Sequence, residues 1–339
     1  MTISTVNFYC PYLLTPMSLF SLRVLILTAT TLYQAIACWR EDRTPPPGQR
    51  VDVGGFCLHY VTAGTGSPTV VLDHSLGGVE GYFLVDELAQ LARVCIYDRA
   101  GFGWSDHSPH PRTSNQIVTE LDQMLTLAGL EPPYILVGNS FGSYNMRLYT
   151  HRYPEKVVGL VMTDGLHESA MLKMPLILRG LQLFFASGFI LSVLGATLGI
   201  IRLLNIIGVF ELIKPKLRQF SLDSRQAVKR SFCRPKHWVT MTREILSLDT
   251  SGRQVRCAIN LKDLPIVSLK ASSFFIPSLL TVLMPLKAAN RLRDRIHDEL
   301  AKLSTNCVQI PVENSGHFVW VDRPDAIIKA VTILLETTG

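Results

Sequence analysis

A serine flanked by glycines lies between an apolar run and a stretch with helical periodicity. Residues 138–142 read Gly-Asn-Ser-Phe-Gly and directly follow the apolar run 134–137. Two glycines let a strand and a helix approach closely in a sharp turn that exposes the serine at its tip, the arrangement called a nucleophile elbow. Ser140 is therefore our candidate nucleophile for a reaction that passes through a covalent acyl intermediate.

A serine hydroxyl reacts only when a base takes its proton and a carboxylate orients that base. With an elbow of this kind the expected chain order is serine, carboxylate, histidine. His317 meets the last requirement, because it follows the apolar run 307–312 and precedes a helix expected to start near Pro324. We expect it on the loop between the last strand and the last helix, where its imidazole can reach Ser140.

The carboxylate does not stand where it most often does in such proteins, after the strand that follows a central insertion. That strand is expected at 264–269, and no Asp or Glu occurs anywhere in 264–293. One strand earlier, the apolar run 157–163 ends at Asp164. Because the carboxyl ends of parallel strands face one crevice, we expect Asp164 to be the acid of the triad.

Other carboxylates offer alternatives to Asp164. In the alternative interpretation, Asp164 serves only as a cap for the following turn, and Asp294 or Asp298 is the acid. Those two lie in a charge-rich helix, where solvated ion pairs are the simpler interpretation. Asp98, next to Arg99, precedes Ser140 and so breaks the expected order. We interpret that pair as part of a structural network.

A tetrahedral intermediate also needs two preorganised donors for its oxyanion, usually backbone N–H groups. The N–H of Phe141, directly after the nucleophile, is expected to be one of them. The other should come from the loop 74–78, which follows the strand 69–73, and Leu76 is the candidate there. The glycine pair in this loop suits a tight turn that presents N–H groups inward.

These motifs together resemble the α/β-hydrolase superfamily. The chain is similar to a subgroup with a leading hydrophobic segment, a Pro-Pro-Pro-Gly linker (45–48), a Val-Asp-Val-Gly-Gly first strand (51–55) and the block Tyr-Asp-Arg-Ala-Gly-Phe-Gly-Trp-Ser-Asp (97–106). The resemblance runs from about residue 45 to the end and is weakest in the central insertion. It implies hydrolysis of an ester, amide or related bond, with neither a metal nor an organic cofactor.

The chain departs from the usual pattern of this family at two positions. Many relatives have glycine where this chain has Ser75, which alters the expected shape of the oxyanion loop. Asn139 replaces the commoner histidine before the nucleophile. Asparagine occurs there in hydrolases that cleave carbon–carbon bonds, but also in plain esterases. Dehalogenase and epoxide-hydrolase chemistry is disfavoured, because both need a carboxylate in place of Ser140.

The preferred function is that of a serine hydrolase acting on a lipid-like or otherwise hydrophobic carboxylic ester. A carbon–carbon bond or amide hydrolase with the same triad is the alternative within enzymes. A catalytically silent, membrane-tethered binding protein is the alternative outside them. No motif indicates nucleic-acid binding, and the net charge of +6 is modest. The seven cysteines show no spacing typical of a zinc site or a disulfide framework. The oligomeric state stays open.

Strands that alternate with helices predict an α/β fold with a mostly parallel, doubly wound sheet. A helical insertion should interrupt this core and act as a cap that selects the substrate. The expected parts are an N-terminal hydrophobic anchor or signal (1–43), a Pro-rich linker (44–50), the catalytic core (51–166 and 262–339) and the cap (167–261).

Two segments are apolar enough to concern a membrane. Residues 1–22 carry no charge, and 24–39 are again uncharged. A spanning helix needs about 20 apolar residues, so we expect a single retained N-terminal anchor. A cleavable export signal, with a site near Ala37, is the alternative.

In the cap, 180–201 is uncharged and 203–213 is again apolar. Burial of this segment is the preferred interpretation, followed closely by contact with one leaflet. A second span fits the length of the segment, but it would pull the cap away from a sheet whose strands resume near residue 264.

Overall fold

The computed structural model describes residues 16–274 and 284–338, and within them eight strands form one sheet in the order β1-β2-β4-β3-β5-β6-β7-β8. β2 is antiparallel to both of its neighbours, and every pair from β4 to β8 is parallel. The prediction of a mostly parallel, doubly wound sheet is confirmed. The strands are β1 (Gln49–Asp52), β2 (Cys57–Ala63), β3 (Thr69–Asp73), β4 (Val94–Asp98), β5 (Tyr134–Asn139), β6 (Val157–Thr163), β7 (Ile266–Ala271) and β8 (Cys307–Val312).

Helices cover both faces of this sheet. Successive strand residues point to opposite faces, so Val71 and Leu136 belong to one core cluster and Leu72 and Val137 to the other. The first cluster includes residues of α3, α4 and α12, and the second includes residues of α2 and α14. The helices that connect or follow the strands of the core are η1 (Glu80–Phe83), α2 (Val85–Leu88), α3 (Ser114–Leu127), α4 (Phe141–Arg152), η2 (Pro154–Lys156), α12 (Leu286–Leu300), α13 (Val319–Asp322) and α14 (Pro324–Thr338).

Most element boundaries lie within a few residues of those expected from the sequence. The strand expected at 264–269 is β7, shifted by two residues to Ile266–Ala271. The short helix α13 was not expected, because it contains only four residues and has no periodicity to read. The final helix begins at Pro324, as expected.

A group of helices lies between β6 and β7, at the carboxyl ends of the strands. They are α5 (Glu168–Met171), α6 (Leu176–Thr197), α7 (Ile200–Ile206), α8 (Val209–Ile213), η3 (Pro215–Gln219), α9 (Leu222–Phe232), α10 (Pro235–Leu246) and α11 (Leu248–Val255). Within the group, α6 packs along α10. The interpretation that 180–213 is buried is wrong: Leu191 and Ile207 are among many large apolar side chains there that remain exposed. The helices of this segment form a single layer, so only one side of each helix contacts protein. The other side is apolar as well and remains exposed.

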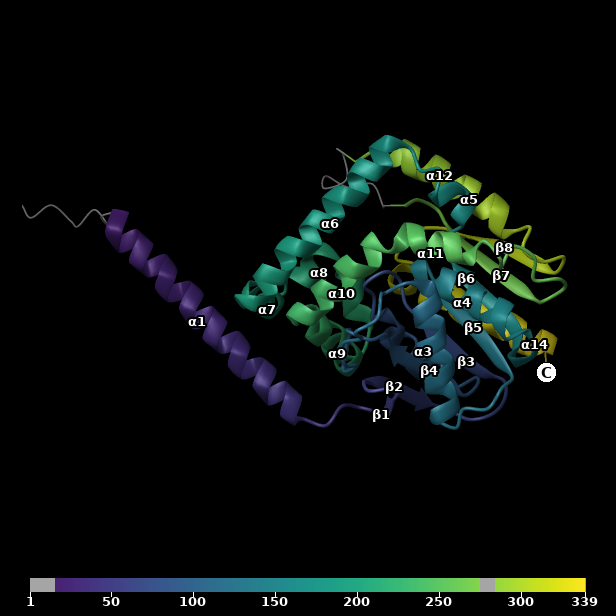
Figure 1. The fold of residues 1–339 in the computed structure, drawn as a ribbon, viewed down its shortest axis with the longest axis horizontal. Helices are drawn as coiled ribbons and strands as arrows, with labels where there is room; N and C mark the ends of the chain where they lie inside the picture. Colours follow the sequence, from purple (N-terminus) through teal and green to yellow (C-terminus); the bar gives the residue numbers. More distant parts are fainter. Residues whose placement is uncertain (1–15, 275–283, 339) are drawn as a thin grey trace, which may run out of the picture.

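The first helix, α1 (Pro16–Arg43), extends away from the remainder of the molecule, and α6 and α7 lie on the side of the domain that faces it (Figure 1). Both α1, over Phe20–Arg43, and α6 are long and apolar enough to cross a membrane. The contacts of α1 with the domain include α6 and α7, the carbonyl oxygen of Cys233 after α9 and the side chain of Arg234 before α10.

Replacing Gly142 by alanine should lower the midpoint of thermal unfolding, because the added Cβ would lie 2.5 Å from the carbonyl oxygen of Asp73. Overpacking against backbone costs about 1–3 kcal/mol. Gly180→Ala is the matched control, since nothing lies within 4 Å of a Cβ at that position of α6. Alanine there should stabilise the helix by about 0.5–1 kcal/mol. Circular dichroism of both variants measures the shifts, and equal midpoints would contradict the close approach.

Candidate active site

The turn between β5 and α4 has the geometry of a nucleophile elbow. Ser140, at its tip, adopts φ 49° and ψ −111°, a conformation that a residue with a side chain rarely adopts. A Cβ at Gly138 would lie 2.7 Å from the backbone of Gly142. The two glycines therefore allow α4 to pass close to β5 and β3, and this contact keeps the serine in its strained position.

Ser140, His317 and Asp164 meet at the carboxyl edge of the sheet. The Ser140 hydroxyl lies 2.7 Å from Nε2 of His317, and Nδ1 of His317 lies 2.6 Å from Oδ2 of Asp164. The tautomer that satisfies both contacts has Nδ1–H donating to the carboxylate and Nε2 accepting from the hydroxyl. His317 lies between β8 and α13, where its ring stacks on Phe274 at a centroid distance of 4.7 Å.

Asp164 follows β6 directly and is buried. Its second oxygen, Oδ1, accepts hydrogen bonds from the N–H of Ala271, at 3.2 Å, and from Nε2 of His297, at 3.1 Å. Burial alone would raise the pKa of Asp164, but the hydrogen bonds from His297 and His317 outweigh it and hold the pKa well below its usual value. The carboxylate therefore stays ionised and can stabilise an imidazolium.

The alternatives to Asp164 lie elsewhere. Asp294 is half exposed and pairs with Lys270 at 2.8 Å, and Asp298 is exposed. Asp164 also does not cap α5, because the N-cap residue of that helix is His167, whose side chain accepts from the N–H of Ser169. Among these three acids, only Asp164 lies beside the imidazole of His317.

His297 was missed by the sequence analysis, which treated its helix as a charged surface element. The side chain is fully buried, and its Nδ1 has no hydrogen-bond partner among the described residues. A signal was available, because the buried residues of α12 recur at helical spacing: Ala289, Leu292, Arg293, Ile296, His297 and Leu300. That periodicity places His297 on the inner face of the helix, while Asp294 and Asp298 fall on the outer face.

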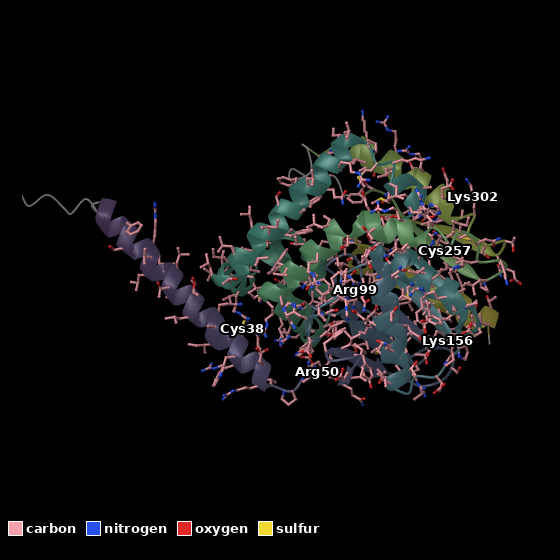
Figure 2. All side chains as sticks on the ribbon, viewed as in Figure 1. Cys38, Arg50, Arg99, Lys156, Cys257 and Lys302 are labelled. Carbon is pink, nitrogen blue, oxygen red and sulfur yellow. The ribbon has the colours of Figure 1, made fainter. Side chains whose placement is uncertain are left out.

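The loop 74–78 is held by a buried cation. Arg99 lies in the interior, where the sheet meets the inserted helices (Figure 2). Its guanidinium donates to Asp73 at 2.7 Å and to Glu244 of α10 at 2.8 Å. It also donates to the carbonyl oxygens of His74, at 2.9 Å, and Ser75, at 2.7 Å. Burial of Arg99 is offset by these two carboxylates, which keep its charge and raise its pKa.

Leu76 and Phe141, the expected oxyanion donors, line the same pocket as Ser140 and His317. The N–H of Leu76 makes no hydrogen bond to any described residue. Phe141 is the first residue of α4, and the first N–H groups of a helix lack an intrahelical partner. Both groups are therefore available to a developing negative charge.

The two departures from the family pattern share one buried partner, Glu80. Its Oε1 accepts from the N–H of Ser75 at 2.8 Å and from Nδ2 of Asn139 at 2.8 Å. Burial disfavours the charged form of Glu80, but nearby His74 and the Ser75 hydrogen bond lower its pKa overall. Glu80 thus links Asn139 to the loop 74–78, a connection that no spacing in the sequence reveals.

Asp98 belongs to a separate buried network. It contacts Nδ1 of His59 at 2.8 Å and accepts from the hydroxyl of Tyr82 and from the N–H of Trp104, the latter at 2.9 Å. The ring of Trp104 packs under the guanidinium of Arg230, 4.5 Å from the ring centre. The structural interpretation of Asp98 therefore agrees with its contacts, and Trp104 lies outside the pocket residues.

An apolar pocket of about 180 Å³ opens above Ser140. Leu178, Leu181 and Phe185 of α6 form one wall, and Leu292 and Ile296 of α12 form another. The polar groups of the pocket are few and include the Ser140 and His317 pair. Such a lining can accommodate a hydrocarbon chain beside the hydroxyl of Ser140.

Residues 68–234 match the family described as having the alpha/beta hydrolase fold. An "AB hydrolase superfamily protein" of Gibberella zeae is 35% identical over 85 residues, which is 24% of this chain and 26% of that protein. The epoxide hydrolase CorEH aligns over 86% of this chain and 99% of its own, with TM-score 0.63 and 17% identity. The enol-lactonase from Burkholderia xenovorans LB400 aligns over 85% and 100%, with TM-score 0.58 and 17% identity.

At these identities the solved structures establish the fold and not the substrate. The aligned parts make up only 20% to 37% of the lengths of four curated relatives. The match of the family over 68–234, the sheet order and the solved structures agree with one another. This chain therefore belongs to the α/β-hydrolase superfamily.

Proposed function

We propose that this protein is a serine hydrolase that cleaves hydrophobic carboxylic esters through an acyl-enzyme intermediate. One observation carries the proposal: the hydrogen-bonded series Ser140, His317 and Asp164 ends in an apolar pocket. The nucleophile contacts its base, and the base contacts a buried ionised acid. Leu76, whose N–H has no hydrogen-bond partner among the described residues, lines the same pocket. These are the four roles that acyl transfer requires.

The reaction follows from these positions. Ser140 Oγ attacks the ester carbonyl carbon while Nε2 of His317 takes the hydroxyl proton, and Asp164 stabilises the resulting imidazolium. The N–H groups of Leu76 and Phe141 bind the oxyanion. The carbon–oxygen bond to the alcohol then breaks as His317 returns the proton to the leaving oxygen. A water molecule next attacks the acyl carbon and gives its proton to His317, which passes it to Ser140 as the carboxylic acid leaves.

Asn139 gives no reason to prefer carbon–carbon bond cleavage, because its amide is engaged with Glu80 in support of the oxyanion loop. A silent binding protein would have no need for Ser140 in a strained conformation, nor for an ionised carboxylate buried behind an imidazole. The apolar pocket favours esters with hydrocarbon acyl or alcohol groups over polar amides.

A retained membrane anchor accompanies this proposal. Export-signal cleavage near Ala37 would remove Gln34, a buried residue of α1. Its Nε2 donates to the carbonyl oxygen of Cys233 at 2.7 Å, and its Oε1 accepts from Nε of Arg202 at 2.5 Å. Cleavage would therefore remove both of these hydrogen bonds, together with the packing of Thr30 against Gly199. The docking of α1 therefore favours retention over cleavage.

Ser140→Ala should abolish both turnover of a short-chain nitrophenyl ester and labelling by a fluorophosphonate probe. The reason is that the alanine side chain has no nucleophile, while the neighbouring fold is unchanged. Ser187→Ala is the control, because this exposed serine of α6 bonds only to the carbonyl oxygen of Leu183 in its own helix, and the variant should keep its labelling. Undiminished labelling of the Ser140 variant would remove the mechanism.

Asp164→Asn should reduce kcat by about 10⁴-fold, the size of effect known for amides at the acid of a serine triad. The amide can neither fix the tautomer of His317 nor stabilise its charged form. Asp294→Asn removes a half-exposed ion pair with Lys270 and a longer one with Arg293, at 3.9 Å, and should leave kcat nearly unchanged. Steady-state kinetics on the nitrophenyl ester compare the two variants, and the reverse ranking would refute the acid assignment.

His297→Phe should lower kcat by about 10-fold or more with little change in KM, because a hydrogen bond to a charged group contributes about 1.5–3 kcal/mol. Without this donor the pKa of Asp164 rises. The low pKa keeps the carboxylate of the parent protein ionised as the pH falls. In the variant this carboxylate is protonated at a higher pH, so activity should begin to fall at a higher pH on acidification. His297→Gln keeps a hydrogen-bond donor, so its kcat and its pH profile should lie close to those of the parent protein. An unmoved pH profile would limit His297 to packing.

A further inference from the structure

Helix α6 is apolar on two opposite sides. Its inward side, with Leu178, Leu181 and Phe185, lines the pocket above Ser140. Its outward side exposes Leu183, Phe184, Ile190, Leu191 and Leu194, which include pairs three, four and seven residues apart and so share one face. A single helix therefore separates the pocket from an exposed hydrocarbon surface.

The outward apolar surface continues over α7 and α8 through Leu203, Ile206, Ile207, Leu212 and Ile213, all exposed. We call the outward side of α6, α7 and α8 the apolar platform. Soluble monomers rarely expose contiguous apolar patches of more than a few hundred Å², and larger ones mark protein or membrane contacts. The platform therefore needs an occupant.

Only three charged residues occur from Leu176 to Ile213, and each is paired toward the protein. Arg179 bonds to Asp249 at 2.7 Å and Arg202 to Glu41 at 2.5 Å. Glu211 pairs with Lys229 of α9. A surface designed only for solubility would direct such charges outward. Here they face inward, which leaves the outward side free of charge.

Polar contacts fix the platform to α1. Arg202 of α7 donates both to Gln34 and to Glu41 of α1. Arg234 donates to Glu41 at 3.1 Å and to the carbonyl oxygen of Cys38 at 3.1 Å. Cys38 is labelled on α1 in Figure 2, on the part of the helix that faces the domain. Gly199 packs directly against the backbone of Thr30. The exposed apolar side chains of α1 therefore continue into those of α6 and α7.

We propose that the apolar platform lies in the same lipid leaflet that α1 enters, and that the ester substrate passes from this leaflet around α6 into the pocket. The occupant of the platform is lipid hydrocarbon. The route of the substrate rests on the proposed hydrolase function, whereas the position of the platform does not. The substrate class is then a lipid ester dissolved in the bilayer.

Charges at the borders of the platform agree with this position. Lys173 precedes α6 and is exposed, and Lys216 and Arg218 follow α8 and are also exposed. Cations beside an apolar surface match the phosphate and anionic groups at the bilayer interface. α6 itself lies along the interface and does not span it, because its inward side packs on α10 and on the pocket.

The position of the platform can be tested with the full chain in phosphatidylcholine vesicles. A cysteine introduced at Leu191 carries an environment-sensitive nitrobenzoxadiazole dye, in a background with Cys257→Ser. Leu127 is the matched control: it is also an exposed leucine, 60% against 69%, but it ends α3 near the opposite edge of the sheet. Labelled parent protein, without the introduced cysteine, supplies the signal to be subtracted.

At position 191 we expect blue-shifted emission and at least twofold quenching by lipids that carry a doxyl group on the acyl chain, and at 127 neither effect. Water-like emission at 191 would overturn the proposal. A blue shift without doxyl quenching would mean that a second protein copy covers this face, and would equally overturn it.

The entry route is tested by Leu191→Lys combined with Leu194→Lys, neither of which lines the pocket. Turnover of a long-chain diacyl ester in the vesicles is divided by turnover of a soluble short-chain ester in the same sample. The ratio should fall at least tenfold, because the charged face no longer settles among the acyl chains. An unchanged ratio would refute entry from the leaflet. Failure of the unaltered protein to cleave the soluble ester would instead refute the hydrolase function.

Discussion

The close approach of α4 to the ends of β3 and β5 is the constraint on which the rest of the site depends. Gly142 sits against the carbonyl oxygen of Asp73, and Gly138 sits against Gly142. At this contact the elbow that carries Ser140 and the loop that carries Leu76 touch backbone to backbone. Because backbone atoms cannot move aside as a flexible side chain can, the distance between Ser140 and the N–H groups of Leu76 and Phe141 is set by the fold itself.

From that contact a series of buried polar groups extends outward. Arg99 ties the oxyanion loop to Glu244 of the inserted helices, and Glu80 ties the same loop to Asn139 beside the nucleophile. A buried charge needs ion pairs or hydrogen bonds to offset its loss of water, so these contacts favour one arrangement of loop and insertion. The pocket therefore has rigid polar support on the side of the sheet and an apolar wall on the side of α6.

Polar contacts also connect the site to the proposed membrane anchor. The polar contacts of Arg202 with α1 hold α7 beside the helix that we propose enters the bilayer, and α6 connects α7 to the pocket wall. Under the proposed arrangement, the anchor does more than localise the enzyme, since it orients the one helix that separates lipid from nucleophile. Hydrophobic substrates would then reach Ser140 without crossing water, which suits molecules that are nearly insoluble.

Local spacing was enough to predict the elbow, the parallel sheet and the positions of Ser140, Asp164 and His317 at strand ends, because glycine requirements and strand periodicity act between near neighbours in the chain. Only the tertiary structure decided which acid meets His317, because Asp294 and Asp298 differ from Asp164 in the direction they face. It also revealed His297 and Glu80 as partners, and the exposure of α6. A preference for burying 180–213 was natural for so apolar a segment. Whether protein covers one side or both sides of such a helix depends on how distant elements pack, and amino-acid composition does not specify that packing.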